Sequence, residues 1–352
     1  MALFILRRLG VMLLTILCLT FVVFFLTNLQ PNLEKLAKTQ GNMRMTDEQV
    51  EIWLANRGYD RPVFVRYGEW LGVLPGWVGE TSQGEPVGRC TAEGMPPLAE
   101  GEAPPAFCGV LQGNWGWSTV FRAPVGEIIS TRLGLTGILM FWVMVVMVPM
   151  ALLIGVLAGM REGSRTDRSL STVSIISTAT PEYVSGVILI AVFASSAVGL
   201  RWFNGTATSA MENVTFQNFT LPVVTIALYG MGYIARMTRA SMTEVMTAQY
   251  IRTARLKGVS FRNIVMKHAL RNALIAPFTV IMLQFPWLLN GVVIVETLFN
   301  YKGFGWTLVQ AAGNNDIELL LAVSVVSVIV VLVTQLISDI GYVYLNPRIR
   351  IS

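Results

Sequence analysis

The chain has 352 residues, of which 53% are hydrophobic and only 13% are charged. Soluble domains carry about 25% charged residues, so this composition excludes an ordinary soluble enzyme or binding module and favours a chain surrounded by lipid. The formal net charge of +5 would suit a nucleic-acid-binding protein, but the positions of the charges along the chain do not form a nucleic-acid patch.

Long apolar runs dominate the sequence. A helix needs about 20 residues to cross the hydrocarbon core of a bilayer, and six runs reach that length. The sequence therefore predicts an all-α integral membrane protein with six transmembrane helices and with both termini on the same side. Five of these runs are uncharged and the sixth is interrupted only by Glu182; they cover residues 9–33, 133–160, 169–200, 213–235, 272–295 and 319–338.

The first run could also be the apolar core of a cleaved signal peptide. It is too long for a typical one, and no small-x-small cleavage site follows it cleanly. We interpret residues 1–33 as a retained N-terminal transmembrane helix that is oriented by Arg7 and Arg8.

Residues 34–132 separate the first two apolar runs, and we expect them to form an external subdomain with structure of its own. Thr46 and Gln49 have the spacing of a capping box, which predicts a short helix that continues through Ala55. Gly58 suits the end of this helix, because glycine readily adopts the left-handed conformation found there.

The remainder of this subdomain contains a second amphipathic segment at 62–71, followed by a Gly- and Pro-rich stretch at 74–105 that we expect to be irregular. Cys90 and Cys108 lie here, whereas Cys18 lies in the first apolar run. In an oxidising compartment the pair could form a loop-closing disulfide. Two free thiols are the alternative, because the sequence does not fix the distance between them.

The distribution of basic residues predicts how the chain is oriented in the membrane. When both termini and the loops 161–168 and 236–273 are placed on one side, that side has fifteen lysines and arginines and three acids. Cytoplasmic loops have an excess of Lys and Arg. We therefore expect both termini to be cytoplasmic.

The most basic stretch is 250–273, which has six Lys or Arg residues, no acid, and the only histidine of the chain, His268. Its charge is typical of any cytoplasmic loop, so charge alone does not assign it a function. A metal site at His268 is not expected, because there is no second His, Cys pair or carboxylate cluster beside it in the sequence.

Several motifs in the same order give a resemblance to a known family. They read FILRRLGVMLLTI at the start, NWGWSTVFRAPVGEIISTRL before the second apolar run, TARLKGVS and HALRNA in the basic stretch, and VVIVETLFNYKGFGWTLVQAA and DIGYVYLNPRIR near the end. Over nearly the whole chain they resemble the permease subunits of dipeptide/oligopeptide-type ABC importers. The resemblance implies the ABC type I importer permease fold, with a large external loop subdomain after the first helix and a five-helix core at 133–352.

This resemblance also implies partners and a location. A second homologous permease, two ABC ATPase subunits that bind ATP and Mg, and a periplasmic substrate-binding protein would assemble with the chain in the bacterial inner membrane, and the cargo would be a peptide or peptide-like solute. The chain has no P-loop motif G-x-x-x-x-G-K-[ST], so we expect it to bind no cofactor and to have no enzymatic site of its own. No nucleic-acid partner is expected.

The basic stretch resembles the ATPase-coupling loop of that family. Thr253, Ala254 and Gly258 would be the small residues that allow close approach to an ATPase, and Gly258 would end a short helix. Arg252 stands where the broader pattern has glutamate, so a glutamate contact with the ATPase is not expected there. The full set of candidate coupling residues is Tyr250, Arg252, Thr253, Ala254, Arg255, Lys257, Gly258 and His268.

Three acids lie within or at the edge of apolar runs, where ionisable groups are costly and often functional. Glu182 follows Pro181 and is a candidate for the substrate pathway, with a purely structural acid as the alternative. Glu296 is a second pathway candidate with a gating or docking role, and Asp339 is interpreted as structural.

Other functions were weighed against this interpretation. Departures from the family pattern, such as Lys302-Gly303-Phe304-Gly305, leave the cargo open, so a nickel chelate, glutathione, an opine or a sugar are alternatives. An ion-coupled secondary transporter would need an embedded ion site and commonly an inverted repeat, and neither is evident. An intramembrane enzyme using Glu182 and Asp339 has no nucleophile or metal ligand to match.

Overall fold

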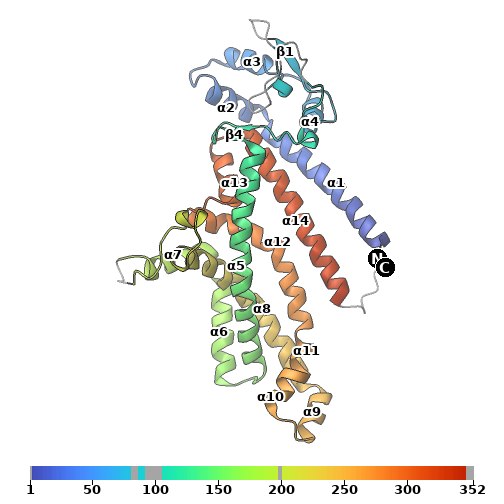
Figure 1. Cartoon of the computed structure of the whole chain (residues 1–352), viewed down its shortest axis with the longest axis vertical. Helices are drawn as coiled ribbons and strands as arrows, with labels where there is room; N and C mark the ends of the chain where they lie inside the picture. The colour runs from blue at the N-terminus through green and yellow to red at the C-terminus, as the bar shows by residue number, and fades with distance from the viewer. Residues whose placement is uncertain (1, 81–85, 92–104, 197–199, 346–352) are drawn as a thin grey trace. The chain divides into compact units, whose positions relative to one another are not determined.

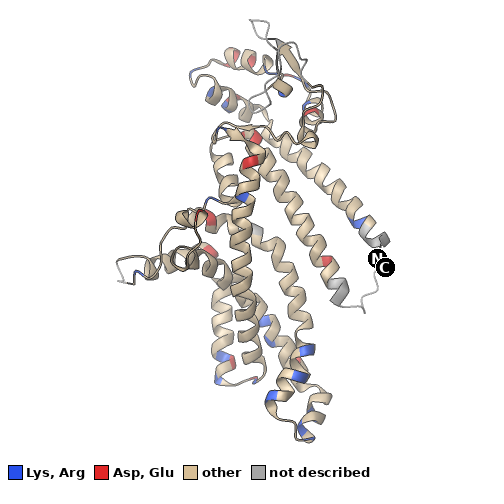
Figure 2. Cartoon of the chain, in the orientation of Figure 1, with Lys and Arg blue, Asp and Glu red and all other residues tan. Residues whose placement is uncertain are grey.

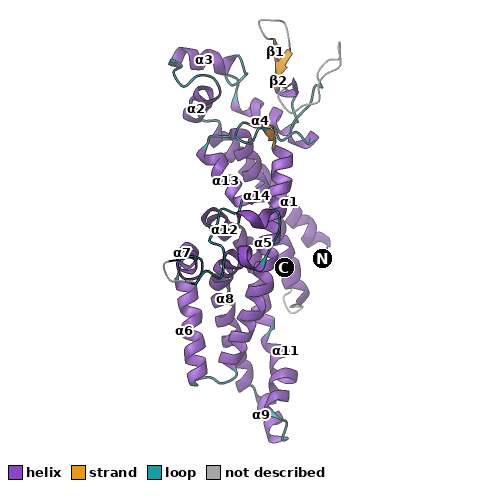
Figure 3. Ribbon diagram, turned by 60° about the vertical axis from the view of Figure 1, so that its left-hand side comes forward, coloured by secondary structure: helices purple, strands orange, loops and turns teal. Residues whose placement is uncertain are grey.

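The computed structural model describes residues 2–80, 86–91, 105–196 and 200–345. Helices make up most of these residues, and the strands assigned in them form two short antiparallel pairs (Figure 1, Figure 3). The chain packs as two units. Unit 1 contains Met1–Leu133 and Thr307–Ile329, and unit 2 contains Gly134–Trp306 and Val330–Ser352.

Four helices are long and apolar enough to cross a membrane: α1 (Ala2–Thr27), α5 (Val125–Gly159), α8 (Phe216–Thr247) and α14 (Ile317–Leu345). Two bent helix pairs also pass this test. One joins α6 (Arg165–Ala179) to α7 (Glu182–Phe193), and the other joins α10 (Phe261–Asn263), η4 (Ile264–Ala269) and α11 (Leu270–Ala273) to α12 (Ile275–Leu298). Six spans result when each pair is counted as one span.

The run 169–200 was expected to form one span and is instead two helices with a bend of 107° between them. Thr180 has an extended backbone, with φ −90° and ψ 120°, and Pro181 caps the second helix. Proline disfavours the helical conformation of the residue before it and lacks the N–H that would continue the helix. Pro181 therefore breaks a run that was expected to be one helix.

In unit 1 the first helix is shorter than its apolar run. α1 ends at Thr27, and the amide of Asn28 donates back to the Phe24 carbonyl at 2.9 Å. α2 (Gln30–Gln40) then begins with Pro31 in its first turn, a position that tolerates proline because its N–H would be unpaired there anyway. The expected helix to residue 33 is therefore wrong by about two turns.

The external helices follow their local signals. α3 (Asp47–Ala55) has the expected capping box, with both reciprocal bonds between Thr46 and Gln49 present. Gly58 follows it with φ +73°, the left-handed conformation expected of it. α4 (Val63–Leu71) occupies the second amphipathic segment.

The stretch expected to be irregular contains a small hairpin. β1 (Val78–Glu80) pairs antiparallel with β2 (Pro86–Gly88), and the 3₁₀ turn η1 (Arg89–Thr91) follows; residues 81–85 and 92–104 lie outside the described part. η2 (Val110–Gln112) and the pair β3 (Trp117–Ser118) and β4 (Ala123–Pro124) lead to α5. One buried apolar cluster of unit 1 contains Phe24, Leu33, Leu36, Ala37, Val50, Leu54, Trp70, Ile317, Leu321 and Val325.

Unit 2 is built around α8, which packs on α6, α7 and α12. η3 (Thr208–Met211) precedes α8, while α9 (Gln249–Leu256) and the first part of α13 (Phe304–Gly313) complete the unit. Gly155 and Gly159 of α5 lie against the α8 backbone: a Cβ at these positions would be 2.6 Å from the Ala235 carbonyl oxygen and 2.7 Å from that of Arg239. Small residues at this spacing allow the two helices to approach closely.

Candidate functional site

The basic stretch forms the end of unit 2 that follows α8. Ala248 has an extended backbone and separates α8 from α9. α10, η4 and α11 then return the chain toward α12 (Figure 1). Lysines and arginines gather on these short helices, as Figure 2 shows.

α9 has one buried face and one exposed face. Ile251 is fully buried and Ala254 is 9% exposed. Both pack in a cluster whose other buried members are Met242, Met246, Ile264, Val265, Ala269 and Ala273. The exposed face carries Arg252, Thr253 and Arg255, and Leu256 next to it is 82% exposed. The helix is thus fixed to its own chain by two apolar side chains and presents a basic face with one large apolar residue.

Gly258 ends this helix in the way the sequence indicated. Its φ is +76°, and its N–H donates to the Arg255 carbonyl at 3.0 Å. The N–H of Val259 donates to the Ala254 carbonyl at 3.2 Å, and Val259 packs beside the apolar cluster. These two bonds and this contact make a Schellman motif, which satisfies carbonyls at the helix end.

The structure separates the candidate coupling residues into two groups. Ala254 faces the core of its own unit, where its small size lets α9 pack closely; its expected role toward an ATPase stays a prediction. Seven candidates are exposed to solvent: Tyr250, Arg252, Thr253, Arg255, Lys257, Gly258 and His268. The Tyr250 hydroxyl accepts a hydrogen bond from the Asn272 amide at 3.0 Å, which ties α9 to α11.

His268 lies in η4, a π-helical turn that the sequence did not indicate. Such wide turns recur at functional sites because they shift the side chains that follow. Among the described residues no group of three His, Cys, Asp or Glu side chains is arranged to hold a metal.

A second feature near this end is an ion pair between helices. Asp167, in the first turn of α6 and 3% exposed, accepts hydrogen bonds from Arg239 of α8 through Nε at 2.5 Å and Nη2 at 2.8 Å. The Gly163 N–H and the Ser171 hydroxyl also donate to this carboxylate. Sequence patterns did not single out the pair, although Asp167 is one of only three acids on the side expected to be cytoplasmic.

Glu296 is fully buried and has a structural set of contacts. Its carboxylate accepts hydrogen bonds from the Thr136 hydroxyl and, at 2.9 Å, from the Trp306 N–H in the first turn of α13. The Thr136 hydroxyl in turn accepts from the Phe304 N–H at 2.8 Å. The carboxylate therefore caps a helix inside the protein. A pathway role for Glu296 stays a prediction.

The two glycines of the sequence Lys302-Gly303-Phe304-Gly305 lie so close to their neighbours near Glu296 that a side chain would not fit. A Cβ on Gly303 would collide with the Glu296 carboxylate and the Thr136 hydroxyl. One on Gly305 would lie 2.7 Å from the backbone of Val293 in α12. The turn between α12 and α13 therefore depends on close backbone approach.

The other two acids lie apart from the basic stretch in sequence. Glu182 is half-buried at the first position of α7, where a carboxylate is favoured by the helix dipole. Asp339 is half-buried on α14. The roles assigned to these two residues stay predictions.

A groove of about 450 Å³ runs between α8 and α12 beside the basic stretch. Its lining combines polar and apolar side chains, including Ser241, Glu244, Asn272 and Thr279. The groove shares Asn272 with the contact to Tyr250.

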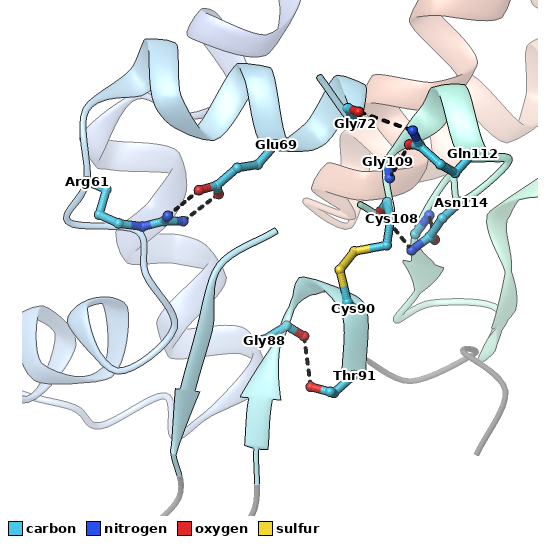
Figure 4. Close-up of a disulfide and its surroundings, with 11 residues drawn as sticks. Arg61, Glu69, Gly72, Gly88, Cys90, Thr91, Cys108, Gly109, Gln112 and Asn114 are labelled. Atoms are coloured by element: carbon cyan, nitrogen blue, oxygen red, sulfur yellow. Dashed lines mark hydrogen bonds and ion pairs between the residues drawn. A yellow bond between two sulfur atoms is a disulfide. The ribbon is translucent and has the colours of Figure 1, made fainter. Parts of the chain in front are cut away.

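In unit 1 a disulfide joins Cys90 and Cys108, so the alternative of two free thiols is wrong (Figure 4). Their Cα atoms are 5.4 Å apart and both residues are 2% exposed. The bridge ties η1 to the segment before η2, where the Asn114 amide donates to the Cys108 carbonyl. Gly76 lies against both sulfurs, since a Cβ there would be 2.6 Å from the Cys90 Sγ.

Comparison with known proteins shows which family the chain belongs to. Residues 151–351 match the family described as "Binding-protein-dependent transport system inner membrane component". The probable peptide ABC transporter permease protein y4tP of Sinorhizobium fredii is 38% identical over 68% of this chain and 77% of its own length. The oligopeptide transport system permease protein AppB of Bacillus subtilis is 35% identical over the same shares of the two chains. The glutathione transport system permease protein GsiC of Salmonella choleraesuis is 34% identical over 68% of this chain and 76% of its own.

These matches confirm the resemblance to peptide-type ABC permeases and leave no support for an ion-coupled carrier or an intramembrane enzyme. The matched region contains α9, the Asp167–Arg239 pair and Glu296. The chain belongs to the binding-protein-dependent transport system inner membrane components and is a multi-pass permease subunit of an ABC importer in the inner membrane.

Proposed function

We propose that this permease and a homologous partner enclose the pathway for uptake of peptides, with ATP hydrolysed on two separate ATPase subunits. A periplasmic binding protein would deliver the cargo, and both termini would be cytoplasmic. The peptide assignment is supported by relatives named as peptide and oligopeptide permeases. The relative named for glutathione agrees with it, because glutathione is itself a tripeptide.

The observation that carries the ATPase proposal is the exposed face of α9. Leu256 is 82% exposed at the end of α9. The exposed residues near it in the sequence are basic: Arg252, Arg255 and Lys257. A large apolar side chain surrounded by polar residues is typical of an interface anchor. The basic residues suit an acidic rim on the ATPase, because opposite charges speed association and fix the orientation.

The rigid attachment of α9 supports a coupling role. Ile251 and Ala254 fix its inner face to the end of α8, and the Schellman motif at Gly258 fixes its end. Movement of an ATPase that grips the outer face would therefore pass to α8 and, through the Asp167–Arg239 pair, to α6. ATP binding would draw the two ATPases together and open the pathway outward, and hydrolysis would reset it.

A test of the contact uses Leu256→Asp in the assembled transporter. The tagged permease is purified in mild detergent, and co-purifying ATPase is measured together with ATP hydrolysis. Leu111→Asp is the matched control, because Leu111 is 71% exposed in the external subdomain. We expect Leu256→Asp to lose most of the ATPase and the control to retain it. Equal retention by both variants would refute the proposed contact.

A separate test addresses the cargo. Proteoliposomes containing the complete transporter and its binding protein are loaded with ATP, and uptake of a labelled tripeptide is compared with uptake of a nickel chelate and of a disaccharide. Peptide uptake that stops without ATP supports the proposal. ATP-dependent uptake of another solute with none of peptide would replace the cargo and leave the ATPase contact untouched.

A further inference from the structure

The external helix α4 lies along the last part of α1, as Figure 1 shows for these two elements of unit 1. The Phe64 ring stacks on Phe21 of α1 with ring centroids 5.1 Å apart. The Tyr67 hydroxyl lies 2.7 Å from the Thr20 hydroxyl and donates to the Leu17 carbonyl at 3.2 Å. α4 is thus bonded to α1 well before the end of that helix.

These contacts lie inside the candidate span Leu6–Thr27, which has 22 residues. At a helical rise of 1.5 Å per residue, Thr20 is about 10 Å from the Thr27 end. The hydrocarbon core is about 30 Å thick, close to the whole length of this span. The Tyr67 hydroxyl therefore reaches the depth of the lipid acyl chains.

The side chains of Tyr67 and Glu69 on α4 have hydrogen-bond partners that suit this depth. The Tyr67 hydroxyl has partners on α1, as a hydroxyl away from water requires. Glu69 is 6% exposed and is paired with Arg61 in the external subdomain. Arg66 donates to the Asn28 side chain at 3.0 Å, just beyond the end of α1. Glu69 therefore has a charged partner, and Arg66 has the neutral amide oxygen of Asn28.

Large apolar side chains are exposed on α4 and on the adjoining part of α1. Phe64 is 71% exposed, and Val22 and Phe25 on α1 are 48% and 44% exposed. The most apolar part of α1 is only 11% buried, as expected for a helix that faces lipid. The Phe64 ring extends that lipid-facing surface without a break, because it stacks directly on Phe21.

We propose that α4 is embedded in the leaflet at the Thr27 end of α1, with Phe64 in contact with phospholipid acyl chains. The external subdomain is then attached to the membrane through α4 as well as through α1. Its height above the bilayer is fixed by the Tyr67 bonds to Thr20 and Leu17, which set how far along α1 the helix sits.

The test uses the complete transporter in phospholipid vesicles, with Phe64→Cys carrying a nitroxide spin label in a Cys18→Ser background. Ile52→Cys on α3 is the matched control, because Ile52 is an apolar residue that is 56% exposed in the same subdomain. Collision of each label with lipid-soluble oxygen and with a water-soluble nickel complex is measured. We expect the label at 64 to meet oxygen freely and the nickel complex several-fold less than the label at 52.

Two results would overturn the proposal. Equal access of the nickel complex to both labels would place α4 in water, and shielding of position 64 from both reagents would show that another protein covers it. An independent measurement uses the unmodified chain in vesicles that contain a diazirine acyl-chain lipid. Photolabelling of the peptide that contains residues 63–71 is expected, and its absence beside a labelled α1 would also overturn the proposal.

Discussion

The guanidinium of Arg239 on α8 donates two hydrogen bonds to the nearly buried carboxylate of Asp167 on α6. The Asp167 side chain is 4% exposed and that of Arg239 is 31% exposed. The pair fixes the first turn of α6 to α8, the helix that precedes α9. It therefore joins the proposed coupling surface to the rest of unit 2 by a specific contact.

Loss of one member of this pair should destabilise unit 2. Asp167→Asn leaves the guanidinium with a neutral partner, and breaking a buried pair costs about 3 kcal/mol. We expect a lower thermal midpoint in detergent and weaker coupling of ATP hydrolysis to uptake. Arg236→Gln on the same helix is the control, since Arg236 is exposed. If the two variants melt alike, the pair is not structurally important.

Glu296 should behave as a buried capping group. Glu296→Ala removes acceptors for the Trp306 N–H and the Thr136 hydroxyl, and unpaired buried donors cost about 1–3 kcal/mol each. We expect lower expression and a lower thermal midpoint. The loss of stability in the double variant with Thr136→Val should be smaller than the sum of the two single losses, because the two residues share one hydrogen-bond network. Glu212→Ala is the control, because Glu212 is exposed. If Glu296→Ala loses uptake but keeps its stability, the result would support a pathway role for Glu296.

The disulfide should stabilise the external subdomain. Its loop spans a sequence separation of 18, for which loop-closure entropy suggests about 3 kcal/mol. Cys90→Ser with Cys108→Ser should speed proteolysis of residues 34–124 under non-reducing conditions. Cys18→Ser is the control, because Cys18 is exposed on α1 and unbonded. Equal proteolysis of all three proteins would show that the bridge adds nothing to stability.

Substitution of Gly258 should reduce transport, because its left-handed backbone conformation is unfavourable for other residues. A Cβ there meets nothing within 4 Å, so the cost of Gly258→Ala is that of φ +76° alone, about 1 kcal/mol. Gly113→Ala is a matched control, with φ +84° and equally open space in the external subdomain. We expect reduced ATP-driven uptake only for Gly258→Ala. Equal uptake by both variants would mean that the end of α9 tolerates distortion without loss of coupling.

Local signals in the sequence were reliable where neighbouring residues decide the structure. The Thr46 capping box and the left-handed Gly58 and Gly258 each depend on a few adjacent residues. The break at Thr180–Pro181 was not predicted, because proline can either kink a helix or end it. Which of the two occurs depends on whether neighbouring helices can accommodate a bend of 107°.

The sequence by itself determined that this is a multi-pass, mostly helical membrane protein with a basic loop of a permease family, because hydrophobic length, charge excess and motif order are properties of the chain. Only the tertiary structure decided that Ala254 faces inward, that Glu296 caps a helix, and that Asp167 meets Arg239. Those outcomes depend on residues far apart in the chain. Their physical basis is packing and hydrogen bonding between helices, which no local pattern of residues specifies.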